Sequence, residues 1–92
     1  PVTPLEAMAG ACVPIVSDLR CFADYLTDSH NAFVFGLAGE PATQLAATMT
    51  RAGAAPRPAL QAAALTTARG YTVQRVCDRY EADFRSLCAQ PQ

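Results

Sequence analysis

The pattern of apolar and polar positions predicts helices at both ends of the chain. Near the start, Thr3-Pro4-Leu5-Glu6 is typical of a capping box, with Thr3 at the N-cap and Pro4 in the first turn. Pro14 then interrupts the pattern, because proline has no N–H to donate to the preceding turn. Beyond it, one helical face continues to about residues 28–31. The apolar positions are Leu5, Met8, Ala9 and Cys12 before the proline, and Ile15, Leu19, Phe22 and Leu26 after it.

The second half of the chain predicts two further helical stretches. One runs over residues 42–51 and ends at Gly53, a residue that suits the C′ position. After a proline-rich connector, the last stretch begins with Pro58 in its first turn and continues to about residue 89. Gly70 costs about 1 kcal/mol in a helix interior, so it can bend or split this helix. The clearest apolar face follows it and consists of Val73, Val76, Cys77, Tyr80, Phe84, Leu87 and Cys88.

Residues 32–39 form the most apolar run of the chain. They can be a short buried helix or an extended segment through the core, because periodicity does not separate the two over so few residues. We expect a short helix capped by Asn31. The pattern then gives four or five helices and no convincing strand, which predicts a single all-α helical bundle over residues 1–92.

The composition indicates that such a bundle needs covalent support. The chain has 92 residues, of which 51% are hydrophobic and 16% are charged. Much of the apolar content is alanine, which buries little area per residue. A chain of this length also buries only about 60–65% of its unfolded surface. We therefore expect the four cysteines to form two disulfides that staple the small core.

The spacing of the cysteines limits their pairing. Within a helix, Cys12 and Cys21 would lie about 13 Å apart and Cys77 and Cys88 about 16 Å apart, beyond the ~7 Å between Cα atoms that a disulfide allows. Antiparallel terminal helices predict the bonds Cys12–Cys88 and Cys21–Cys77, which we prefer. Parallel helices would give Cys12–Cys77 and Cys21–Cys88 instead. A zinc site would need closer cysteine pairs, and free structural thiols are the remaining alternative.

Disulfides in turn predict an oxidising location. We expect a secreted protein, extracellular or periplasmic, whose signal peptide has been removed. The net charge of −1 argues against nucleic-acid binding, which needs a basic patch. No apolar run approaches the ~20 residues that a transmembrane helix requires.

The residues available for catalysis are few. His30 is the one histidine, and no serine has a base beside it in the sequence. The carboxylate pairs Asp24 with Asp28 and Asp78 with Glu81 are typical of solvated helix faces. The sequence therefore predicts no enzymatic activity, no metal site and no cofactor.

Residues 25–30, Tyr-Leu-Thr-Asp-Ser-His, resemble the Tyr-Leu-x-x-His element of small secreted haem-binding proteins of actinobacteria. The resemblance implies a helical protein in which tyrosine and histidine lie near the haem iron. Here the step from Tyr25 to His30 is five residues, where that family has four, so the two would not share a helical face without a break. The alternative interpretation is a helix C-terminus whose histidine complements the helix dipole.

Two functional hypotheses follow. The first is a non-enzymatic interaction protein whose rigid, stapled bundle recognises a protein partner. The second is a carrier of a small hydrophobic ligand, a lipid or haem, in a cavity between helices. The residues predicted to bind that ligand are Tyr25, His30, Phe33, Phe35 and Leu37.

Overall fold

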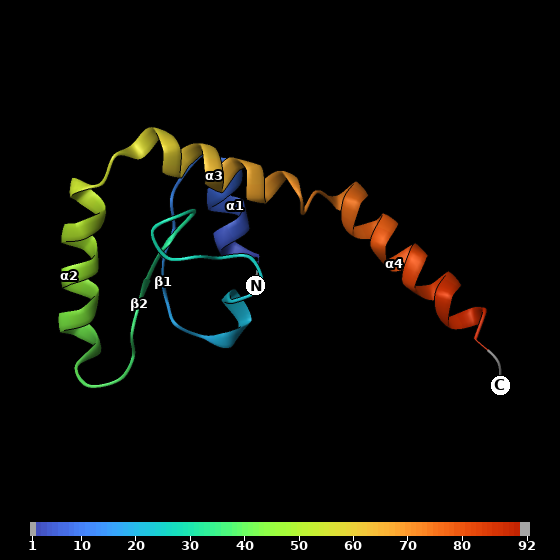
Figure 1. The fold of residues 1–92 in the computed structure, drawn as a ribbon, viewed down its shortest axis with the longest axis horizontal. Helices are drawn as coiled ribbons and strands as arrows, with labels where there is room; N and C mark the ends of the chain where they lie inside the picture. The colour runs from blue at the N-terminus through green and yellow to red at the C-terminus, as the bar shows by residue number, and fades with distance from the viewer. Residues whose placement is uncertain (1, 91–92) are drawn as a thin grey trace.

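The computed structural model describes residues 2–90, and its fold is mixed rather than all-helical (Figure 1). In chain order the elements are α1 (Thr3–Ala9), β1 (Ile15–Ser17), a 3₁₀ turn η1 (Arg20–Phe22), β2 (Phe33–Phe35), α2 (Pro41–Ala54), α3 (Arg57–Arg69) and α4 (Val73–Cys88). The predicted all-α bundle is therefore wrong in the first half of the chain, where a two-stranded parallel sheet replaces a long helix.

Helix α1 ends well before Pro14. The N–H of Cys12 donates to the carbonyl of Ala7, and the N–H of Ala11 donates to that of Met8. These two bonds form a Schellman motif, in which the residue after the helix adopts a left-handed conformation. Ala11 has that conformation, with φ of 61°. The expected capping box is also wrong, since Thr3 lies inside the helix and the N-cap is Val2.

The chain then runs extended through β1. Ile15 lies opposite Phe33, and Val16 lies opposite Val34. The pair is extended by a bond from the N–H of Phe33 to the carbonyl of Pro14 at 2.8 Å. Branched and aromatic side chains suit such half-buried strands. For residues 32–39, the extended alternative is thus confirmed and the expected short helix is wrong.

The core lies where α1 packs against α3 beside the strands. Met8 is completely buried, and so are Ala32 and Ala64. Val16 and Leu26 complete the buried cluster, and partly buried Leu5, Phe22, Tyr25, Val34 and Ala68 pack around it. Two of the five residues of the buried cluster are alanines, so Met8 and Leu26 carry much of its buried apolar area.

Three helices in the second half agree with the predicted pattern. α2 covers the expected stretch, although Gly53 lies within it and the helix ends at Ala54. The last predicted helix is split into α3 and α4 at Gly70, the residue that was predicted to bend or split it. Thr72 caps α4, since its side chain accepts a hydrogen bond from the N–H of Arg75 at 3.3 Å.

The predicted disulfides are wrong, because all four cysteines are free and exposed. Neither Cys12–Cys88 with Cys21–Cys77 nor the alternative Cys12–Cys77 with Cys21–Cys88 is formed. The argument required a helix through residues 12–21 that packs along α4. Instead the first half turns away after α1, and α4 extends away from the rest of the fold (Figure 1). Without these bonds, the expected secretion loses the observation on which it depended.

Candidate functional site

Helix α4 is the most exposed element of the protein. It extends from the end of α3 toward the C-terminus, away from the other helices (Figure 1). Whereas α1 packs on α3 and α2 lies along β2, α4 has no such extended contact among the described residues, and none of its residues is buried. The radius of gyration is 16.5 Å, against about 12 Å for a compact chain of this length. The elongation comes from α4.

One face of α4 is nonetheless apolar. Val73 is 82% exposed, and Tyr80, Phe84 and Leu87 are each 60–63% exposed. The Tyr80 and Phe84 rings stack, with centroids 6.4 Å apart and an angle of 23° between their planes. Soluble proteins rarely expose several large apolar side chains together without a binding role.

The spacing on this face alternates four and three residues. It runs Val73, Cys77, Tyr80, Phe84 and Leu87, which is the spacing of the seam in a coiled coil. The sequence pattern had predicted this apolar face but not what it contacts. The signal missed was its narrow, heptad-like spacing, which is typical of helix-to-helix pairing.

The polar side of α4 carries balanced charges. Three arginines, Arg75, Arg79 and Arg85, oppose three carboxylates, Asp78, Glu81 and Asp83. Two intrahelical contacts hold part of this set: Arg85 forms an ion pair with Glu81, and Gln74 donates to Asp78 at 2.9 Å. Helices that lie on membrane surfaces usually have a basic polar face. The balance therefore favours another polypeptide over an anionic lipid surface.

Tyr71 connects α4 to the rest of the fold. Its ring lies 5.6 Å from that of Tyr25, and the Arg79 guanidinium lies 5.3 Å from its centroid on the α4 side. Burial raises the pKa of Tyr25, and Cys21 and Tyr71 add to this rise. Together these contacts fix the first turns of α4 relative to the body.

The residues predicted to bind a ligand do not gather around one cavity. Tyr25 packs against Tyr71, while His30 and Leu37 are exposed. Phe33 is buried and Phe35 is partly buried in β2. Residues 25–30 form turns rather than a helix, so His30 does not complement a helix dipole there.

Phe33 lines two open grooves. One lies between α2 and α3 with His30, and the other lies beside Cys12 and Met49. Both grooves open to solvent. The hypothesis of a hydrophobic-ligand carrier stays a prediction.

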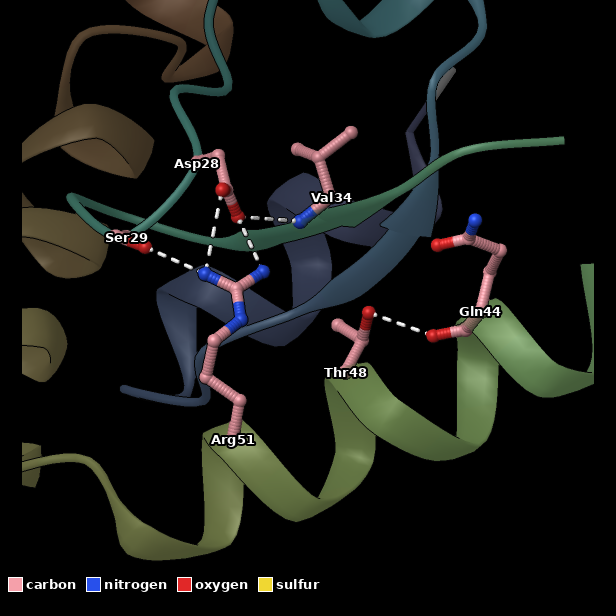
Figure 2. Close-up of polar contacts among 6 residues, drawn as sticks. All are labelled: Asp28, Ser29, Val34, Gln44, Thr48 and Arg51. Carbon is pink, nitrogen blue, oxygen red and sulfur yellow. Dashed lines mark hydrogen bonds and ion pairs between the residues drawn. The ribbon is translucent and has the colours of Figure 1, made fainter. Parts of the chain in front are cut away.

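A polar junction fastens α2 to the loop before β2 (Figure 2). Arg51 of α2 donates to both carboxylate oxygens of Asp28, at 3.0 and 3.2 Å, and to the hydroxyl of Ser29 at 2.7 Å. The N–H of Val34 donates to Asp28 at 2.9 Å. The Arg51 guanidinium also lies 5.0 Å from the Phe33 ring centroid. This junction fixes the position of α2 against the loop before β2.

Acid is expected to weaken this junction. Partial burial would raise the pKa of Asp28, but the hydrogen bonds from Arg51 and Val34 and the charge of Arg51 outweigh it and lower the pKa. Because the Asp28 pKa is lower in the native state, Asp28 stabilises the fold at pH values above its unfolded-state pKa of about 4. This contribution is lost as the pH falls through its native-state pKa. Both side chains are more than 40% exposed, so the contribution is at most about 1 kcal/mol.

The measurement is urea unfolding at pH 7 and pH 3. Asp28→Asn should lose less stability on acidification than the wild type, by up to about 1 kcal/mol. In an Arg51→Ala background the same substitution should make a smaller difference, because the bond from the N–H of Val34 then remains without the arginine. Equal acid sensitivity of wild type and Asp28→Asn would contradict the assigned contact.

The chain matches no family model, no curated protein and no solved structure at a significant level. Within residues 2–90, no helix has both the length and the apolar content needed to cross a membrane. The same residues contain no cluster of three or more metal-binding side chains. The function is therefore inferred from the exposed face of α4.

Proposed function

We propose that this protein is a non-enzymatic interaction module that binds a helical segment of a protein partner through the apolar face of α4. The observation that carries the proposal is an amphipathic helix whose large apolar residues are exposed while the rest of the fold has its own core. Their four-three spacing suits a helical partner.

The attachment of α4 supports the same proposal. A binding element presented in a fixed direction loses less conformational entropy on association. The Tyr25–Tyr71–Arg79 contacts and the Thr72 cap supply that restraint at the helix start. The remainder of α4 is left accessible along its whole apolar face.

The test is selection from a displayed library of amphipathic helical peptides of varied charge. We expect enrichment of peptides with apolar residues at four-three spacing, and at least tenfold weaker binding to the variant Tyr80→Glu with Phe84→Glu. The matched control is Ala82→Glu with Ser86→Glu, which adds the same charge to the opposite face and should bind as the wild type does. Binding that both variants retain, or no enrichment, would overturn the proposal.

A further inference from the structure

We propose that the helical partner is a second copy of this chain, paired through an antiparallel contact between the two α4 helices. This inference rests on the proposed function and specifies its partner. It depends on the order of side-chain sizes along the seam, on the charges that flank it and on the apolar area that it exposes.

The seam is self-complementary in one antiparallel register. Val73 and Cys77 are small, and Tyr80 and Phe84 are large. When two such helices run in opposite directions, Cys77 lies opposite Tyr80 of the second copy and Val73 lies opposite Phe84. Small side chains then face large ones in the layers that these four residues form, the arrangement that fills space between helices. A parallel pair would place tyrosine on tyrosine and phenylalanine on phenylalanine.

The flanking charges select the same register. In it, Glu81 lies beside Gln74 of the second copy, and Asp83 lies beside Val76. In the other antiparallel register, Tyr80 lies opposite Phe84. That register would place Glu81 beside Glu81 of the second copy, and Asp83 beside Asp83 of the second copy. Like charges at flanking positions oppose pairing, so that register is disfavoured.

The exposed area suits a weak, reversible dimer. Val73, Tyr80, Phe84 and Leu87 are 60–82% exposed. In this register Leu87 faces position 70, outside α4, so the pairing covers Val73, Tyr80 and Phe84. With ~150–250 Å² for a fully buried aromatic side chain and less for valine, these three offer roughly 400 Å² per copy. A pair would bury about 800 Å², below the ~1,200 Å² at which stable specific interfaces begin. We therefore expect weak self-association, in the high-micromolar to millimolar range.

The first experiment is sedimentation equilibrium of the whole chain over micromolar to millimolar concentrations. The mass should rise with concentration from 9.7 kDa to twice that value. Tyr80→Glu with Phe84→Glu should stay monomeric throughout, and Ala82→Glu with Ser86→Glu should dimerise as the wild type does. Circular dichroism should show unchanged helix content in both variants, since none of these residues is buried.

The orientation is tested by a short bis-maleimide on single-cysteine variants. In the proposed register, two copies of Cys77 lie about 5 Å apart along the helix axis, and two copies of Cys88 lie about 28 Å apart. The variant that keeps only Cys77 should therefore crosslink into a dimer, and the variant that keeps only Cys88 should not. Crosslinking through Cys88 would overturn the antiparallel arrangement.

The two proposals can fail separately. A wild-type chain that stays monomeric to millimolar concentration, but still selects peptides through α4, would overturn the self-pairing and leave the interaction function standing. A chain that neither dimerises nor selects peptides through α4 would overturn both.

Discussion

Replacing Asn31 with alanine is expected to destabilise the fold by about 3 kcal/mol, because this side chain is the polar centre of the core. Asn31 is 3% exposed. Its carbonyl oxygen accepts from the N–H of Thr27 at 2.8 Å, and its amide donates to the carbonyl of Tyr25 at 2.7 Å and to the hydroxyl of Thr67 at 2.9 Å. It thus holds the loop before β2 against α3.

The size of the effect follows from what the substitution leaves behind. A net hydrogen bond contributes only about 0.5–1.5 kcal/mol, but each buried group left without a partner costs ~1–3 kcal/mol. Alanine would remove the hydrogen-bond partner of two backbone groups of the loop and of the Thr67 hydroxyl at once. That hydroxyl keeps its bond to the carbonyl of Ala63 at 3.0 Å, so most of the loss falls on the loop.

Urea unfolding followed by circular dichroism measures the change. Thr67→Val removes one of the three Asn31 bonds, together with the Thr67 bond to Ala63, with little change in shape, and we expect it to cost about 1 kcal/mol. A loss below 1 kcal/mol for Asn31→Ala would show that the loop does not depend on this side chain.

Met8→Ala is expected to cost about 2–4 kcal/mol. Met8 is the largest fully buried side chain, and it packs in the cluster that joins α1 to the strands and α3. The neighbouring Ala32 and Ala64 have only methyl side chains, which cannot rotate into the cavity that the methionine leaves. A domain of this size has about 5–14 kcal/mol of total stability, so the loss is a large fraction.

The second methionine of the chain is the matched control. Met49 is 58% exposed, and its replacement by alanine should change stability by no more than about 0.5 kcal/mol. Met8→Leu conserves volume and should cost less than about 1.5 kcal/mol. Thermal and urea unfolding of the three variants check these values, and equal costs for the two alanine variants would contradict the assigned core.

Local signals predicted the second half of the chain well. The stretch at 42–51, the split at Gly70 and the amphipathic face after it all appear in the structure. Each depends on helix propensity, proline or glycine position, and spacing within one helix. The exposure of that face was not predicted, because an apolar stripe does not say which element, if any, covers it.

The first half shows why the remainder was missed. Ile15, Leu19, Phe22 and Leu26 have helical spacing, yet Ile15 lies in a strand and Phe22 in a 3₁₀ turn. The strand forms because β2, some eighteen residues later, pairs with it. Such pairing is non-local, and single-chain periodicity does not report it.

The cysteine argument failed for the same reason. It excluded pairing within a helix by arithmetic, but its conclusion required that two distant helices lie side by side. The Schellman turn at residues 10–12 ends α1 early, and within residues 2–90 no helix or strand packs along α4. Spacing alone could not contain that information.

The sequence by itself determined where helices are favoured, where glycine divides the last of them and which face of α4 is apolar, because these depend on neighbouring residues. Only the tertiary structure decided that residues 15–17 and 33–35 form a sheet, that Asn31 is buried and that the cysteines stay apart. It also decided that the apolar face of α4 is exposed. Those outcomes depend on contacts between residues far apart in the chain, whose free energy is set by the whole fold.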